Sequence, residues 1–269
     1  MNLDSPFLRL AVLLSLALAL QDCVRRSWIN GCLESQRCMR LMSLVPKQII
    51  AFACLMSLGA CTFYTAPPFE AWVVDASSER PIEGVIAVAH WQALGGLEGL
   101  NPVRQVMIME NVSDRDGRIS FPKWSKFSRQ TVKWDRPELL FFRNGYEPRR
   151  LINEQYLASI WPHQVLKSEW SGKHIAMVPF KGSLPSYYEH VWNLDFSMQF
   201  ARRGESCEWK ETPRMITALH QMSIYLELSG AQPRGERIGR LSDLDETQRS
   251  RCGAPEEFLA IYLEHDYTK

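Results

Sequence analysis

The sequence lacks the short motifs by which zinc and serine hydrolases are recognised. No HExxH, HxxE or GxSxG pattern occurs in any frame, so neither a zinc-bound water nor an activated serine is indicated. Only six histidines occur in 269 residues, and no CxxC pair or Cys/His cluster offers the spacing of a metal site. We therefore expect no catalytic residue, no metal ion and no cofactor, and we expect that the chain is not an enzyme.

An excess of charge of one sign is also lacking. The formal net charge is +1, and 46% of the residues are hydrophobic and 23% charged. This is the composition of a globular chain that can bury one or two cores. Because nucleic-acid-binding domains carry a strong basic excess, we expect no nucleic-acid partner.

No hydrophobic run is long enough to cross a bilayer as a helix. The two longest, Phe7–Leu20 and Ile49–Leu58, fall short of the roughly twenty residues required. Each is better interpreted as the apolar core of a signal peptide. The first is the poorer candidate, because Asp4 precedes it and Arg9 interrupts it.

Basic residues precede the second run, and a short recognisable motif begins at its last residue. The residues before it include Arg37, Arg40 and Lys47. Its last residue opens the tetrapeptide Leu58-Gly59-Ala60-Cys61, which resembles the lipobox of bacterial lipoproteins. The resemblance implies that a signal peptidase recognises Leu58, Gly59 and Ala60, cuts before Cys61, and leaves Cys61 lipidated.

The same resemblance divides the N-terminal part of the chain. Residues 1–38 become an upstream extension, with Met39 or Met42 as a more natural start; residues 39–60 become the signal peptide and 61–68 a lipid-anchored tether. Two or more acyl chains hold a protein stably on a membrane, so the membrane is an expected partner. The alternative is a genuine first signal followed by a buried second segment.

The residue after the cysteine bears on localisation. Thr62, rather than an aspartate, follows Cys61. By resemblance to well-studied lipoproteins, this implies the periplasmic face of the outer membrane.

The cysteines fit an exported protein. Of seven, four precede the expected cleavage site and Cys61 would take the lipid, which leaves Cys207 and Cys252. An even number in an oxidising compartment indicates one disulfide. Two unrelated buried thiols are the alternative.

The hydrophobic periodicity changes once after the tether. Over residues 69–180 apolar residues alternate or run in short blocks between turn formers, whereas over 181–269 they recur at helical spacing. The expected fold class is therefore α+β, an antiparallel β-sandwich followed by a small helical module. Alternation also predicts two opposite faces of one strand. One face carries Val85, Ala87, Ala89 and Trp91, and the other carries Ile86, Val88 and His90.

Four short motifs follow one another through residues 69–180. They are Val73-x-Asp75, Arg80-Pro81-Ile82-Glu83-Gly84-Val85, Ser113-Asp114-x-x-Gly117 and Phe141-x-x-x-Gly145-Tyr146. In this order they resemble the carboxypeptidase regulatory-like domain, a transthyretin-like sandwich of about seven strands. Two features depart from that family: Ile119 stands where Phe is frequent, and Gln92–Arg104 is expected to be a long loop. The resemblance implies scaffold or interaction work, since the domain is non-catalytic even when attached to a peptidase.

The helical module shows two apolar stripes and a third helix start. The first stripe is Tyr187, Val191, Leu194 and Met198, and the second is Met215, Leu219, Met222 and Leu226. Thr212 is expected to cap the second helix, with Pro213 at its first position. Pro255 is expected to begin a last helix, which continues through Phe258, Ile261 and Tyr262.

Three sets of residues suggest binding, and each also has a structural interpretation. His90 could bind a ligand or, as we favour, pack within its strand. Asp114 with Asp116 could belong to a calcium-binding loop or, as we favour, to a turn. Tryptophans in polar loops could stack on sugar rings or anchor the loops by packing. They are Trp124, Trp134, Trp161 and Trp170.

The expected function is therefore that of an envelope lipoprotein, a structural or interaction module with an envelope protein as its partner. The alternative is a glycan-binding lipoprotein that uses the loop tryptophans.

Overall fold

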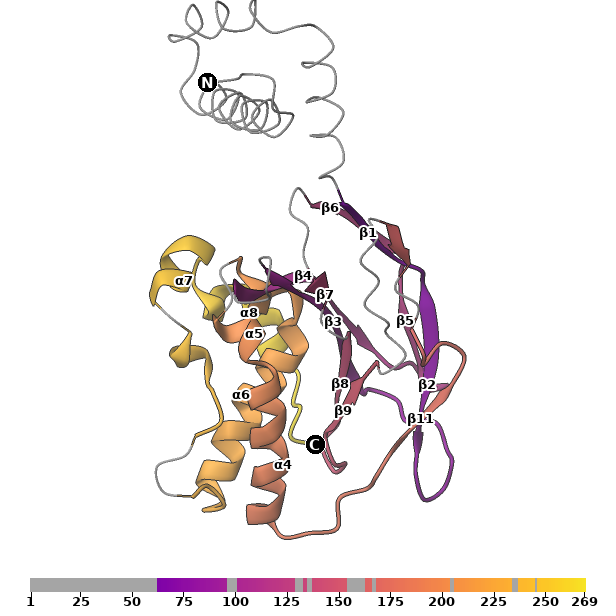
Figure 1. Cartoon of the computed structure of the whole chain (residues 1–269). Coiled ribbons are helices and arrows are strands. Elements are labelled where there is room, and N and C mark those ends of the chain that lie inside the picture. The colour runs from indigo at the N-terminus through magenta and orange to yellow at the C-terminus, as the bar shows by residue number, and fades with distance from the viewer. Residues whose placement is uncertain are drawn as a thin grey trace, which may run out of the picture. The chain divides into compact units, whose positions relative to one another are not determined.

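The computed structural model describes most of the chain that follows the lipobox (Figure 1). The described residues are 62–95, 101–128, 133–134, 137–153, 163–165, 168–203, 206–233, 237–244 and 246–269. They belong to one compact unit, Thr62–Lys269. The predicted extension, signal peptide and lipidation site, residues 1–61, lie outside the described residues.

A middle sheet has the strand order β4-β3-β8-β9, and its strands pair antiparallel. Its strands are β3 (Ile86–Gly95), β4 (Asn101–Val112), β8 (Glu138–Phe142) and β9 (Arg149–Ile152), with the short β7 (Lys133–Trp134) paired to β3. Every residue of β8 is buried. The uninterrupted run Leu139–Phe142 is typical of a strand covered on both faces.

An outer sheet has the order β11-β2-β5. It consists of β2 (Phe69–Asp75), β5 (Arg118–Phe121) and β11 (His174–Met177). β2 and β5 pair antiparallel, but β11 and β2 pair parallel. The expected α+β class with antiparallel sheets and C-terminal helices is confirmed. The parallel β11–β2 pair departs from the expected antiparallel sandwich, because β11 reaches the outer sheet after the chain has passed through the middle one.

A third, small sheet contains the residues that follow the expected anchor position in the sequence. It has the order β10-β1-β6, made of β1 (Thr62–Ala66), β6 (Trp124–Ser128) and β10 (His163–Val165). β1 pairs antiparallel with β6 and parallel with β10. Residues 62–66, which we expected within a tether, instead form this strand.

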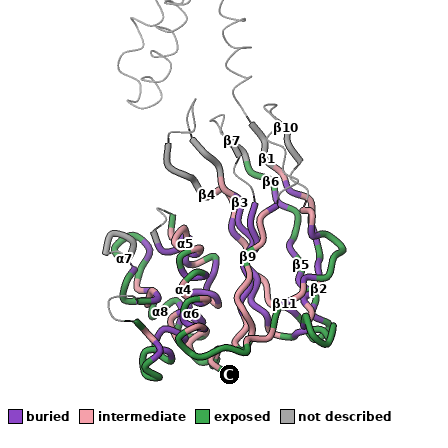
Figure 2. The backbone as a smooth tube through the Cα atoms, turned by 60° about the horizontal axis from the view of Figure 1, so that its bottom comes forward, coloured by how far each residue is buried: buried purple, intermediate pink, exposed green. Residues whose placement is uncertain are grey.

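The middle and outer sheets share one hydrophobic cluster. The outer sheet contributes Phe69, Ala71, Val73, Ile119, Phe121, Ile175 and Met177, and the middle sheet with its lead contributes Val85, Ala87, Ala89, Trp91, Leu139 and Phe141. Ile86 and Val88 belong to a second cluster on the opposite face. The two faces predicted for this strand are confirmed, and Figure 2 shows the buried segments along both sheets.

The four motifs of residues 69–180 contact one another across the fold. The Tyr146 hydroxyl donates to Asp75 Oδ2 at 3.1 Å. The Ser113 hydroxyl accepts from the Val85 backbone N–H at 2.8 Å and donates to the Ile82 carbonyl at 2.7 Å. These bonds join strand ends that are far apart in sequence.

Gly117 fits the same junction because it has no side chain. Its φ is +71°, and a Cβ there would overlap the Val73 carbonyl oxygen and press on Pro81. The Val73 backbone N–H donates to the Gly117 carbonyl at 2.7 Å. Only glycine tolerates both the positive φ and this close approach.

Helices cover the free face of the middle sheet (Figure 1). They are α4 (Leu184–Ser197), α5 (Gln199–Arg203), α6 (Pro213–Leu228), α7 (Glu246–Cys252) and α8 (Pro255–Leu263), with the 3-10 turns η1 (Glu208–Glu211) and η2 (Leu241–Asp243). The cluster beneath them includes Ile86, Val88, Ile108, Leu140 and Phe142 of the sheet. It also includes both predicted stripes of α4 and α6, which are confirmed as buried. Strands and helices therefore share a core.

One boundary prediction was wrong. β3 continues to Gly95 and β4 begins at Asn101, so most of the expected loop 92–104 is strand, with register shifts after Trp91 and Ala93. The last helix was predicted correctly, since α8 begins at Pro255 and contains Phe258, Ile261 and Tyr262, although its fully buried side chain is Leu259 and Ile261 is 69% exposed. A short helix lying on one neighbour buries a narrow stripe, and the sequence does not say where that neighbour lies.

Candidate functional site

The predicted anchor residues lie just before the described residues. Leu58, Gly59, Ala60 and Cys61 fall outside them, and the first described residue, Thr62, opens β1. Among the described residues, no helix combines the length and the apolar character needed to span a bilayer.

Cys207 and Cys252 form a disulfide in the structure, with their Cα atoms 5.8 Å apart. Cys207 directly precedes η1 and Cys252 is the last residue of α7. Cys252 is buried, and both side chains contact the core beneath the helices. The bond thus ties the lead into α6 to the lead into α8.

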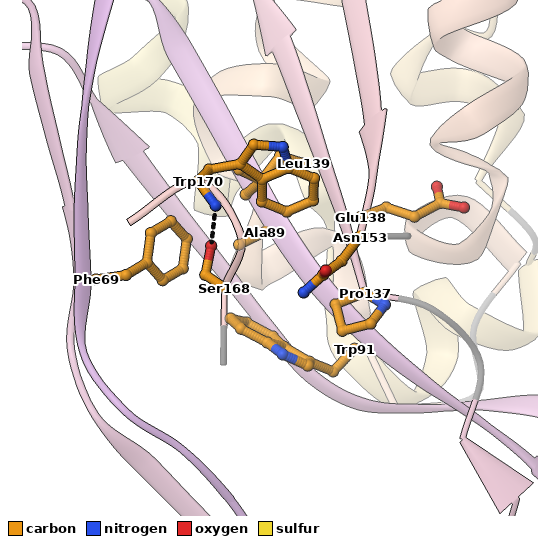
Figure 3. Close-up of a pocket in the computed structure, with 9 residues that line it drawn as sticks. All are labelled: Phe69, Ala89, Trp91, Pro137, Glu138, Leu139, Asn153, Ser168 and Trp170. Carbon is orange, nitrogen blue, oxygen red and sulfur yellow. Dashed lines mark hydrogen bonds between the residues drawn. The ribbon is translucent and has the colours of Figure 1, made fainter. Parts of the chain in front are cut away.

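Two of the four tryptophans that we expected in loops are buried between the sheets. Trp124 and Trp134 lie in β6 and β7 rather than in loops, so the expectation was wrong for these two positions. Trp124 is 5% exposed and Trp170 is 9% exposed, and the ring of Trp124 meets Trp91 edge-on at 5.3 Å. Figure 3 shows Trp91, Trp170 and Phe69 around the same small space, where the Trp170 backbone N–H donates to the Ser168 hydroxyl at 3.2 Å. The cavity there holds about 10 Å³, which is room for about one water molecule and none for a sugar ring.

The other two tryptophans are not placed. Trp161 lies outside the described residues, and the side chain of Trp134 lies outside them too. The described rings act in packing, as expected for loop anchors.

His90 belongs to a buried polar cluster rather than to an open site. Its side chain is 1% exposed, and its Nε2 lies 3.2 Å from Glu138 Oε2 while its ring stacks on Phe200 at 4.2 Å. Arg150 Nε donates to the same Glu138 oxygen at 2.9 Å. Burial alone would raise the pKa of Glu138, but the hydrogen bonds from His90 and Arg150 outweigh it and lower the pKa to about 2. The cluster fastens β3, β8 and β9 together beneath α5.

Asp114 organises a turn. Its Oδ1 accepts the backbone N–H groups of Asp116 at 3.0 Å and Arg118 at 2.9 Å. The hydrogen bond from the Arg118 backbone, above all, holds the pKa of Asp114 below its usual range. No group of three or more possible metal ligands occurs in the described part of the chain.

An open groove of about 480 Å³ runs between the edge of the middle sheet and the start of α6. It is lined from β4 by Met107, Ile108, Met109, Glu110 and Asn111, from β5 and its end by Ser120, Phe121 and Pro122, and from the helical side by Lys210, Glu211, Pro213 and Arg214. β4 is the outermost strand of the middle sheet here. Methionine side chains adapt to varied partner shapes, so the groove is suited to binding a protein surface.

Glu110 closes the inner wall of this groove by capping α6. Its Oε1 accepts the Met215 backbone N–H at 2.8 Å and its Oε2 accepts that of Arg214 at 3.0 Å. Thr212, which we expected to cap this helix, stands at the N-cap position, but its hydroxyl makes no hydrogen bond with any residue that the structure describes. The predicted N-cap position and Pro213 as the first helical residue are confirmed. The predicted capping hydrogen bond is not formed, because a carboxylate from a distant strand occupies the two helix donors.

The electrostatic setting of Glu110 is unusual for a carboxylate. Its side chain is 3% exposed, and Arg214 Nη1 lies 3.5 Å from Oε2. Burial raises the pKa of Glu110 to about 7, against the opposing hydrogen bonds from Met215 and Arg214 and the charge of Arg214.

A sequence signal for Glu110 existed. Ile108 is buried and Val112 packs against the same core, and Glu110 lies between them at the period of a strand. Alternation therefore predicts an inward-facing acid, although its partner, more than one hundred residues further on, is not visible in the sequence.

Comparisons with known proteins identify no family. No family model matches the chain, and no curated protein matches it. A search of solved structures finds a 9R-lipoxygenase from Cyanothece PCC8801 with 12% sequence identity and a TM-score of 0.23, over 71% of this chain and 29% of that one. A similarity this distant carries no argument about the fold or the activity.

The expectation that the chain is not an enzyme does not stand. The structure found by the search is that of an enzyme, and it is too distant to assign an activity. Neither an enzymatic nor a non-enzymatic assignment is therefore made.

Proposed function

We propose that the chain is an envelope lipoprotein, anchored through acylated Cys61 to the periplasmic face of the outer membrane. The lipobox-like run Leu58–Cys61 carries this proposal, because basic residues and then an apolar segment precede it. Strand β1 directly follows the proposed acylated position in the sequence. The folded part would then stand close to the membrane surface.

The folded part acts as a structural or interaction module for another envelope protein. The middle and outer sheets form a transthyretin-like sandwich of the carboxypeptidase regulatory-like type. The hydrogen bonds from Tyr146 to Asp75 and between Ser113 and Val85 support this, since they join residues of four motifs that carry the resemblance. The shared hydrophobic cluster of the two sheets supports it as well.

The groove beside β4 is the proposed partner-binding surface. It combines partly exposed methionines with an edge strand and charged rim residues, Lys210, Glu211 and Arg214. The burial of Trp124 and Trp170 favours protein binding over glycan binding, because those rings offer no surface for sugar stacking.

Site-directed photo-crosslinking of the full chain in bacterial envelopes tests this function. We expect a photo-reactive residue at Met109, in the groove, to capture one envelope protein that a residue at the exposed Lys173, before β11, does not capture. Cys61→Ser should abolish membrane retention and the crosslink together. Equal capture at both positions, or none at either, would contradict a partner in the groove.

A further inference from the structure

The groove beside β4 lies along the edge of that strand rather than against one of its faces. It is lined by five consecutive residues of β4, 107–111. Successive side chains of a strand point to opposite faces. Met107 and Met109 pack against the core between the two sheets, whereas Ile108 belongs to the core beneath the helices. A groove bounded by both sets must follow the strand edge, where the backbone groups point.

The pairing of β4 with β3 determines which backbone groups point into the groove. Ser113 directly follows β4, and its N–H donates to the Val85 carbonyl at 2.9 Å, so the backbone of Ser113 is turned towards β3. The register of residues 107–112 has no shift, and in an antiparallel pair every second residue turns its N–H and C=O to the partner strand. Counting back from Ser113, the N–H and C=O groups of Ile108 and Glu110 therefore point away from β3 and into the groove.

These outward backbone groups have no strand beside them. Among the described strands β4 pairs only with β3, and no hydrogen bond between described residues engages the backbone of Ile108 or Glu110 on the groove side. The Val106 carbonyl, just before the groove, is by contrast occupied, because it accepts from Lys126 Nζ at 2.6 Å. Soluble proteins commonly block exposed edges with lysine side chains or bulges, so the open stretch between Ile108 and Glu110 is an exception to that rule.

The two walls of the groove differ in chemistry. The outer-sheet wall is mainly apolar, with Phe121 and Pro122 beside the methionines of β4. On the helical wall the basic Lys210 and Arg214 outnumber the acidic Glu211. Lys210 lies over the rings of its neighbours rather than in an ion pair with any described residue. An extended segment fits both walls when its side chains alternate, apolar towards the outer sheet and acidic towards Lys210.

We propose that the envelope partner binds here by adding a strand to the middle sheet. A partner segment of about five residues in extended conformation pairs with residues 107–111 of β4 and exchanges backbone hydrogen bonds with Ile108 and Glu110. Main-chain hydrogen bonds supply affinity in such complexes, and the alternate side chains supply specificity. This inference rests on the proposed function, because it states the form in which the partner enters the groove.

Hydrogen exchange of the purified full chain tests the open edge before any partner is added. The amides of Ile108 and Glu110 should exchange faster than those of Met109 and Asn111, which face β3. This order is expected although Ile108 is only 6% exposed and the Glu110 side chain 3%. Equal protection of the two sets would show that the edge is closed and would overturn the inference.

Strand addition is then tested with a synthetic peptide that copies the segment crosslinked at Met109. N-methylation at every second residue removes the N–H groups along one edge of the peptide. In one of the two possible phases it should weaken binding about tenfold or more, and in the other it should change binding little. With peptide at about ten times its Kd, protection of the Ile108 and Glu110 amides should rise about tenfold. Lys210→Gln should weaken binding about two- to fivefold, whereas Lys173→Gln, at an exposed position, is the control and should not.

The outcomes separate this inference from the proposed function. Weakening in neither phase, or equally in both, would overturn strand addition and leave a partner in the groove. Failure of the Met109 crosslink itself would contradict the proposed function, and the inference would fall with it.

Discussion

At the scale of single residues, a few side chains hold together strand ends that are distant in the sequence. Asp75 accepts the backbone N–H and the hydroxyl of Ser77 and the hydroxyl of Tyr146, and the Ser77 hydroxyl above all holds its pKa well below the usual range. Gly117 lies at the same junction, against Val73. Because Asp75 and Gly117 are buried at this junction, changes here should affect folding strongly.

Gly117→Ala should destabilise the fold. The new Cβ would overlap the Val73 carbonyl oxygen, and alanine would also be held at φ +71°. We expect a loss of about 2–4 kcal/mol in the free energy of unfolding, measured by urea denaturation. Gly145→Ala is the control, since φ is +83° there but no atom lies within 4 Å of the new Cβ. Its cost should be about 1–2 kcal/mol, and equal costs would refute the steric argument.

Glu138→Gln should change how much folding stability is lost at acid pH. The pKa of Glu138 is lowered to about 2 by His90 and Arg150, against burial, so the stability it contributes is present above pH 4.5 and lost as the pH falls through about 2. The contribution is of order 3 kcal/mol at most. Thermal unfolding from about pH 6 to about pH 2 should show a shallower loss in Glu138→Gln than in the wild type. Glu83→Gln, at a carboxyl group that is 65% exposed, should keep the wild-type slope; parallel slopes for all three proteins would rule out this role.

At the scale of elements, the helical layer is held by local patterns and by long-range ties. The stripes of α4 and α6 are readable from the sequence because helical periodicity is local. Glu110 fastens α6 to the sheet, and the disulfide ties the lead into α6 to the lead into α8. Both ties join residues that are distant in the chain.

Cys207→Ala with Cys252→Ala should weaken this layer without changing the fold. The cysteines are 45 positions apart, so loss of the cross-link should lower the free energy of unfolding by about 4 kcal/mol on the chain-entropy model. The measurement is denaturant unfolding with and without a reducing agent. Reductant should lower the stability of the wild type to that of the double variant and leave the double variant unchanged; a wild type insensitive to reductant would argue against a stabilising bond.

Several elements could be predicted from the sequence, and the reasons are physical. Alternation in Val85–Trp91 gave both faces of β3, and the unbroken run Leu139–Phe142 matches a strand buried on both sides. β1 was missed because Thr62–Ala66 pairs with strands 60 to 100 residues away. For the candidate site, the inward face of Glu110 follows from strand periodicity, but its helix partner does not, because no local pattern encodes a contact across the fold.

At the scale of the whole molecule, sheets and helices form one unit with two cores that share the middle sheet. The proposed anchor at Cys61 would hold this unit close to a membrane, and β1 follows it directly in the sequence. The envelope location and the envelope partner both depend on that anchor.

Mass spectrometry of the chain purified from membranes of a lipoprotein-processing bacterium tests the anchor most directly. We predict an N-terminal peptide that begins at Cys61 and carries acyl chains, with residues 1–60 removed. An unmodified thiol at Cys61, or peptides from upstream still attached to it, would contradict the account.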